Sequence, residues 1–95
     1  MTPDKVIVSI EIQSGDFCDN YELPANVPLK DFQRPLLEAL IQRFPQNMAL
    51  RLCLAEGVVF FRKDGFPPEL IPEEDTLAAH GMRTGSRLLV HREWH

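Results

Sequence analysis

Residues 28–44 carry the longest periodic apolar pattern in the chain. Their apolar side chains recur at spacings of three and four, at Leu29, Phe32, Leu36, Leu37, Leu40, Ile41 and Phe44. This spacing places a broad apolar stripe on one face of an α-helix. A helix with one apolar face needs a second layer to cover it, and the rest of the chain reads as short strands and turns. We therefore expect an α+β domain with one main helix over about residues 29–44.

Two prolines mark this helix. Pro28 is suited to its start, where Asp31 in the first turn faces the positive end of the helix dipole. Pro35 lies further inside, where it removes the amide that would bond to the carbonyl of Asp31. We expect a bend or a loosened first turn at Pro35, on the side facing solvent.

The sequence before the helix predicts an antiparallel hairpin. In residues 5–12, apolar residues alternate with others, and only Ile7 breaks the polar face. The expected inward set is Val6, Val8, Ile10 and Ile12. Residues 13–16 supply turn formers, and residues 17–23 can return as a second strand.

Three further strands are expected after the helix. Residues 48–55 alternate leucine with Arg51, Cys53 and alanine, which indicates a strand with one dry face. A short apolar strand is expected at residues 58–61 and a last one at 86–92. Between them, residues 62–75 predict a long loop rich in proline and acid, with Leu70-Ile71 anchoring its middle to the core. A short helical turn closed by glycine is expected at residues 76–81.

Length and charge limit the function. The 95 residues suit a single domain spanning 1–95. A net charge of −4 argues against a nucleic-acid partner. No apolar run approaches the roughly 20 residues of a membrane helix, and the N-terminus lacks a secretory signal pattern. We expect a cytosolic domain without direct membrane insertion, either standing alone or as part of a larger protein.

Residue types that carry chemistry are sparse. The two cysteines, Cys18 and Cys53, are too few for a disulfide framework and are not spaced like a metal site or a CxxC pair. His91 and His95 would diverge at a strand end, so no metal site is expected. No nucleophile-and-base pattern or phosphate-binding glycine loop is present. The sequence predicts no enzyme activity, no cofactor and no metal.

Two stretches resemble known families. Residues 76–90, TLAAHGMRTGSRLLV, resemble the ubiquitin-like pattern, in which a Thr-Leu turn leads through a glycine bend to a terminal apolar strand. Residues 23–29, LPANVPL, with Pro35-Leu36-Leu37 following, resemble the narrower YukD/EsaB group of bacterial type VII secretion systems. The same domain begins the membrane protein EccD in the mycobacterial versions of these systems. With Leu50-Arg51-Leu52 and the terminal strand, the similarity covers most of the chain.

The resemblance implies a fold and a function. It implies a ubiquitin-like β-grasp, with a mixed five-stranded sheet curled around one main helix. It implies a non-catalytic adaptor or regulator of a type VII (WXG100/ESX) secretion apparatus, in the cytoplasm or at the cytosolic face of the membrane. Its partners would be proteins such as the secretion ATPase or membrane components, and the oligomeric state stays open.

Two alternatives remain open at this point. The chain could be the cytosolic N-terminal domain of an EccD-type membrane subunit. It could also be a ubiquitin-like modifier or sulfur carrier, which needs a Gly-Gly ending, whereas this chain ends in Arg92-Glu93-Trp94-His95. A longer native C-terminus would restore that second alternative.

The resemblance also predicts a protein-binding face. In ubiquitin-like folds the third and fifth strands are neighbours, and their outward residues form the usual recognition surface. By the expected strand pattern these residues are Arg51, Cys53, Arg87, Leu89 and His91. They would make a basic patch with one exposed leucine, and a plain solvated sheet face is the alternative. Strands two and three are not adjacent in this fold, so Cys18 and Cys53 should be free thiols.

Overall fold

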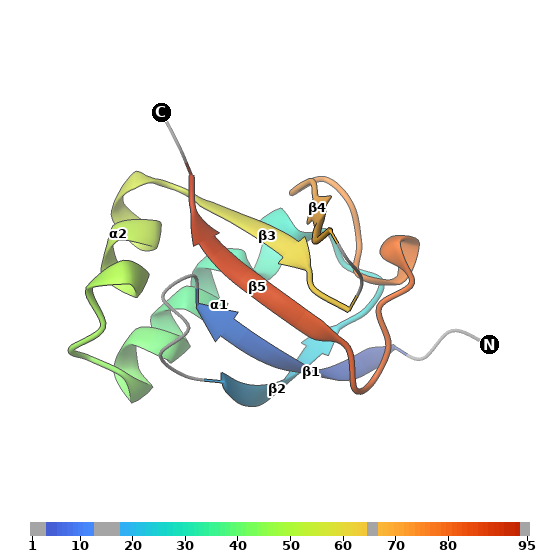
Figure 1. The fold of residues 1–95 in the computed structure, drawn as a ribbon, viewed down its shortest axis with the longest axis horizontal. Helices are drawn as coiled ribbons and strands as arrows, with labels where there is room; N and C mark the ends of the chain where they lie inside the picture. Colours follow the sequence, from blue (N-terminus) through green and yellow to red (C-terminus); the bar gives the residue numbers. More distant parts are fainter. Residues whose placement is uncertain (1–3, 13–17, 65–66, 94–95) are drawn as a thin grey trace.

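The computed structural model describes residues 4–12, 18–64 and 67–93, and shows five strands and three helical elements (Figure 1). In chain order these are β1 (Lys5–Ile12), β2 (Cys18–Pro24), α1 (Leu29–Arg43), α2 (Met48–Glu56), β3 (Val58–Arg62), β4 (Glu69–Ile71), the 3₁₀-helix η1 (Ala78–His80) and β5 (Arg87–Arg92). The strand order in the sheet is β2-β1-β5-β3-β4. β1 and β5 are parallel and the other pairs are antiparallel. The expected mixed five-stranded α+β architecture is therefore confirmed.

The β1–β2 hairpin agrees with the sequence pattern. The two strands pair antiparallel, with Val6 opposite Leu23 and Ile10 opposite Asp19. The four expected inward side chains, Val6, Val8, Ile10 and Ile12, are at most 1% exposed. Ile7 points to the opposite face and is 45% exposed. The period-two pattern thus fixed both the strand and its register against the core.

Helix α1 lies behind the sheet in the view of Figure 1 and buries its apolar stripe against it. The fully buried residues of the stripe are Leu29, Leu36, Leu37 and Leu40, and Phe32, Ile41 and Phe44 are partly buried. Pro35 is exposed, as expected, and the helix continues through it to Arg43. The bend at Pro35 stays a prediction.

The start of α1 is completed by a distant part of the chain. Pro28 precedes the helix and offers no side-chain cap. Instead, the N–H of Leu29 donates to the carbonyl of Asp75 (3.1 Å), and the N–H of Lys30 donates to the carbonyl of Glu73 (2.9 Å). The first amides of a helix have no hydrogen-bond acceptor within the helix, and these two carbonyls provide the acceptors. The segment between β4 and η1 is thereby fixed to α1.

The expected strand at residues 48–55 is wrong, because these residues form helix α2. They are mostly leucine, alanine, methionine and arginine, which favour helices, and include no β-branched or aromatic residue. The side chain of Asn47 caps the helix by accepting from the N–H of Leu50 at 3.3 Å. Leu50 and Cys53, one turn apart, are 0% and 2% exposed, whereas Leu54 is 38% exposed.

The expected long loop at residues 62–75 contains the fifth strand instead. β4 pairs with β3, placing Ile71 opposite Phe60 and Leu70 opposite Phe61. Ile71 is 2% exposed and anchors the segment, as predicted. Leu70 points the other way and is 51% exposed, so its predicted anchoring role is wrong. The predicted number of five strands is correct, but one of the five lies at residues 69–71 and not at residues 48–55.

Candidate protein-interaction surface

Apolar side chains gather on the face of the sheet opposite α1. Phe60, Ile71, Leu88 and Val90 are buried against the helix, so the alternate positions on these three strands face outward. We call this outward set the outer strip; it consists of Val59 and Phe61 on β3, Leu70 on β4, and Leu89 and His91 on β5.

The strand register brings the members of the outer strip into contact distance. Phe61 pairs with Leu89 on one side and with Leu70 on the other, and Val59 pairs with His91. Directly opposite residues on one face of a sheet lie about 4.5–5.5 Å apart at Cβ. The rings of Phe61 and His91 also meet edge to face, with centroids 6.1 Å apart and planes at 74°. The strip is therefore a continuous surface rather than a set of isolated side chains.

The side chains of β1 that border the outer strip are polar, while Ile7 lies further along the same face of β1 and is exposed. On β1, next to β5, Ser9 lies opposite Arg87, and the Ser9 hydroxyl donates to the side chain of Asn20 on β2 at 2.9 Å. Glu11 lies opposite Leu89 and forms an ion pair with Lys63. An apolar cluster bordered by polar side chains is typical of protein-interaction sites.

The five predicted binding residues do not form one patch. Arg87, Leu89 and His91 lie on the outward face of β5, as predicted. Arg51 and Cys53 lie on α2 because that segment is helical. The guanidinium of Arg51 donates to the carbonyl of Pro45 (3.0 Å), and Cys53 is buried. The predicted basic patch is thus wrong in composition, while a binding role for the β5 residues stays a prediction.

Sequence reasoning missed three members of the outer strip. Val59 and Phe61 belong to an uninterrupted apolar run, which does not show which side of the strand faces the core. Leu70 was assigned to the core because β4 was not recognised. The signal that could have found them is the run itself: four consecutive apolar residues in a strand require both sheet faces to be covered or leave one face apolar and exposed.

The thiol of Cys53 is free and buried. Burial raises the pKa of this thiol to about 11, against a smaller lowering by the charge of Arg92. A thiol with this pKa stays protonated at neutral pH and is a poor nucleophile. The prediction of a free thiol is confirmed for Cys53, while the side chain of Cys18 lies outside what the structure describes.

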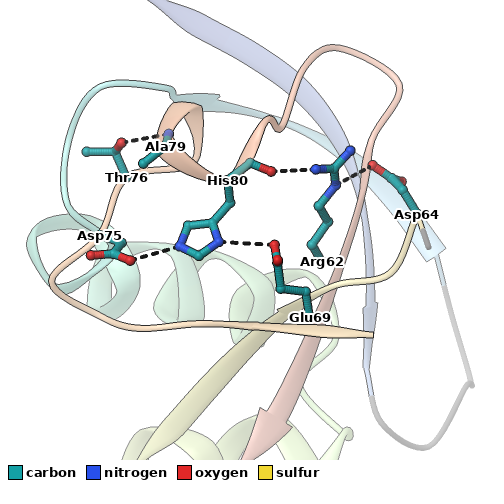
Figure 2. A network of polar contacts seen from close by, with 7 residues as sticks. All are labelled: Arg62, Asp64, Glu69, Asp75, Thr76, Ala79 and His80. Atoms are coloured by element: carbon teal, nitrogen blue, oxygen red, sulfur yellow. Dashed lines mark hydrogen bonds and ion pairs between the residues drawn. The ribbon is translucent and has the colours of Figure 1, made fainter. Parts of the chain in front are cut away.

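A separate cluster of polar side chains surrounds His80 (Figure 2). The ring Nε2 of His80 lies 2.8 Å from Oδ2 of Asp75, and Nδ1 lies 3.1 Å from Oε2 of Glu69. The hydrogen bond to Asp75, helped by Glu69, raises the pKa of His80 even though burial opposes this. The imidazole thus joins β4, the loop after it and η1. We call this group of three side chains the His80 clamp.

Arg62 and Asp64 extend this network toward β5 (Figure 2). Arg62 donates to the carbonyl of His80 and to the carboxylate of Asp64, the latter at 3.2 Å. The N–H of Arg87 donates to the other Asp64 oxygen at 2.7 Å. Burial would raise the pKa of Asp64, but the hydrogen bonds from Arg87, Ser86 and Arg62 outweigh it and lower that pKa. This carboxylate therefore ties the end of β3 to the start of β5.

Within residues 4–12, 18–64 and 67–93, no three side chains of histidine, cysteine, aspartate or glutamate are grouped so that they could hold a metal ion. In the same part of the chain, neither α1 nor α2 is long and apolar enough to cross a membrane.

Comparison with known proteins identifies the fold. No protein-family model and no curated protein matches this chain by sequence. Solved structures do match, and one is a chain of the MycP5-free ESX-5 inner membrane complex, with a TM-score of 0.72 and 20% identity. That match covers 98% of this chain and 22% of the other, so the chain spans about a fifth of that protein.

Two isolated domains match over nearly their whole length. The EccD5 ubiquitin-like domain from Mycobacterium xenopi gives a TM-score of 0.70 at 17% identity, over 98% of this chain and 99% of the other. The ubiquitin-like domain of the Mycobacterium tuberculosis type VII secretion protein EccD1 gives 0.62 at 23% identity, over 90% and 98% of the two chains. The chain has the ubiquitin-like β-grasp fold, as the sequence resemblance implied.

Proposed function

We propose that this domain is a non-catalytic protein-interaction module of a type VII secretion apparatus, equivalent to the ubiquitin-like domain of an EccD-type protein. The observation that carries the proposal is the outer strip, an apolar surface on the sheet face left uncovered by α1. The choice of system is supported by the EccD ubiquitin-like domains and the ESX-5 inner membrane complex among the structural neighbours. Protein partners within such a complex would then bury the strip.

The polar groups support binding rather than catalysis. His80 is the residue whose type best suits acid–base chemistry, but carboxylates occupy both of its ring nitrogens and leave neither for a substrate. A depression of about 480 Å³ beside α2 is lined by Ile41, Arg51, Leu54 and Ala55, of which Arg51 alone is ionisable. Neither place combines a nucleophile or base with a pocket.

The proposal is tested by capture of partners from cells of the source organism. A tagged chain, crosslinked in cells and purified, should enrich type VII inner-membrane components, including the secretion ATPase. Phe61→Glu with Leu89→Glu should abolish this enrichment, because each change puts a charge on the apolar surface. The matched control is Ile7→Glu, which changes another exposed apolar residue of the same sheet face outside the strip.

Two results would contradict the proposal. Enrichment of no type VII component by the unaltered chain would remove the secretion assignment. Equal loss of capture in the Ile7→Glu control would remove the outer strip as the binding surface. Thermal unfolding of each variant shows whether the fold is retained.

A free-standing adaptor of the YukD/EsaB kind is the second candidate. It is favoured by the resemblance in residues 23–29 and Pro35-Leu36-Leu37. An immunoblot of fractionated cells separates the two candidates. A species near 10.9 kDa outside the membrane fraction indicates the adaptor, and a larger species in the membrane fraction indicates the EccD type. A ladder of larger species that survives denaturation would instead indicate a covalent modifier.

A further inference from the structure

A small pocket lies where β4 ends beside β3. β4 pairs only with residues 60–62 of β3, so Val58 and Val59 have no partner on β4. Figure 1 shows β3 reaching past the shorter β4. Helix α1 contributes Gln33 to the pocket, and the residues that follow β4 and β5 complete it. We call it the edge pocket; its volume is about 250 Å³ and its lining is Gln33, Val58, Val59, Phe60, Leu70, Ile71, Pro72, Glu73 and Glu93.

The polar side chains of the edge pocket are two carboxylates and one carboxamide, and each of them can accept a hydrogen bond. Glu73 and Glu93 bring two carboxylates, and no basic side chain lines the pocket. Neither carboxylate has an ion-pair partner within the described residues. The backbone carbonyl of Glu73 accepts from Lys30, which holds this side of the pocket in place.

The side chain of Gln33 has an oxygen that lacks a hydrogen-bond donor in the part of the chain that the structure describes. Its Oε1 atom is buried and has no hydrogen-bond partner among the described residues. Buried polar atoms are nearly always paired in folded proteins, so an unpaired one needs an explanation. Because this oxygen has almost no accessible surface, a donor in the edge pocket would reach it once the Gln33 side chain turns toward the pocket.

We infer that the edge pocket receives one basic side chain, a lysine or an arginine, presented by a protein partner. Such a side chain has an apolar stem and a cationic head that carries only donors. The stem fits the wall made by Val58, Val59 and Pro72, and the head would meet the carboxylates and Gln33. The volume is below the roughly 300–1,000 Å³ of small-molecule sites, which favours a single side chain over a free ligand.

The edge pocket is continuous with the outer strip, because Val59 and Leu70 belong to both. A partner lying on the strip would therefore pass the mouth of the pocket. The inference rests on the proposed function for one point only, that a protein presents the basic side chain.

Titration with amino-acid probes tests the inference without any partner. The ¹⁵N-labelled domain is titrated with Nα-acetyl-lysine N-methylamide and with the arginine equivalent. Either probe should cause saturable shifts in the side-chain amide of Gln33 and the backbone amides of Val58, Val59 and Ile71. The norleucine equivalent has the apolar stem without the charge and should bind about tenfold more weakly. Absence of saturable shifts at the solubility limit, or equal binding of the norleucine probe, would overturn the inference.

Carboxamide variants identify the recognising groups. Glu73→Gln with Glu93→Gln should weaken binding of the basic probes about tenfold, because it removes both charges of the pocket. Glu74→Gln is the matched control: it removes a charge from the adjacent residue, which does not line the pocket, and should leave binding unchanged. An equal loss in the control would indicate only general charge attraction and would overturn the inference. Failure here leaves capture by the outer strip intact, so the two proposals fail separately.

Discussion

Replacing His80 with alanine should lower the free energy of unfolding by about 1–2 kcal/mol near pH 6. The change removes the side chain that contacts both Glu69 and Asp75. Hydrogen bonds to charged groups contribute about 1.5–3 kcal/mol each, and exposed ion pairs about 0.2–1 kcal/mol. The His80 side chain is 17% exposed, but Glu69 and Asp75 are 58% and 44% exposed, so solvent screening reduces the effect toward the lower range.

The effect of this substitution should depend on pH. The folded state raises the pKa of His80, so the charged ring stabilises the fold fully below the ordinary histidine pKa of about 6.5. This contribution is lost as the pH rises through the raised pKa of the folded state. The stability difference between the original chain and His80→Ala should therefore be largest near pH 6 and small at pH 9.

Urea denaturation followed by circular dichroism between pH 5.5 and 9 measures this difference. With a slope of about 1–1.5 kcal/mol per molar urea, the midpoint should fall by roughly 1 M near pH 6. In a Glu69→Gln, Asp75→Asn background, His80→Ala should cost much less, because the carboxylate partners are already gone. A difference that stays constant over the whole pH range, or persists in that background, would refute the ionic role of the His80 clamp.

Three further predictions concern the core, the thiol and the carboxylate of Asp64. Leu50→Ala should lower the free energy of unfolding by about 2–5 kcal/mol, whereas Leu54→Ala should cost less than about 1 kcal/mol; equal losses in urea denaturation would contradict the packing of α2. In a Cys18→Ser variant, Cys53 should react with a thiol reagent at pH 8 only after the protein unfolds, because the pKa of its thiol is about 11. Rapid labelling of the native protein would contradict the burial of this thiol. Asp64→Asn should lower the free energy of unfolding by about 1 kcal/mol at pH 7. Because the folded state lowers the pKa of Asp64, the stability difference between the two proteins should disappear as the pH falls through that pKa. A stability difference that stays unchanged at low pH would contradict this role of Asp64.

Local sequence patterns correctly predicted β1 and α1. The alternation in β1 and the stripe of α1 each contain several apolar residues at one period, so one structure fits them and others do not. The hairpin and the turn closed by Gly81 also follow from nearby residues, since Gly81 adopts a positive φ of 72°.

The prediction for residues 48–55 was wrong because a strand period and a helix period both fit these residues. Leu50, Leu52 and Leu54 alternate as in a strand, yet Leu50 and Leu54 also share a helical face, and the Asn47 cap decides for the helix. β4 has only three residues, and its pairing with β3 depends on contacts that no local pattern contains. The outer strip could not be predicted for the same reason: which side of Val59 and Phe61 is outward depends on the order of the strands.

The parallel pairing of β1 with β5 has a consequence for how the domain is made. Ser9 lies opposite Arg87 and Ile12 opposite Val90, so the centre of the sheet joins the two ends of the chain. Closing so long a loop costs entropy before its contacts form, and folds with such non-local pairings fold slowly. During synthesis the β1–β2 hairpin can pair from local contacts, but β1 lacks its second neighbour in the sheet until β5 has left the ribosome. The domain should therefore complete its sheet only after β5 is released, and until then chaperones would meet β1 with the edge that pairs with β5 still open.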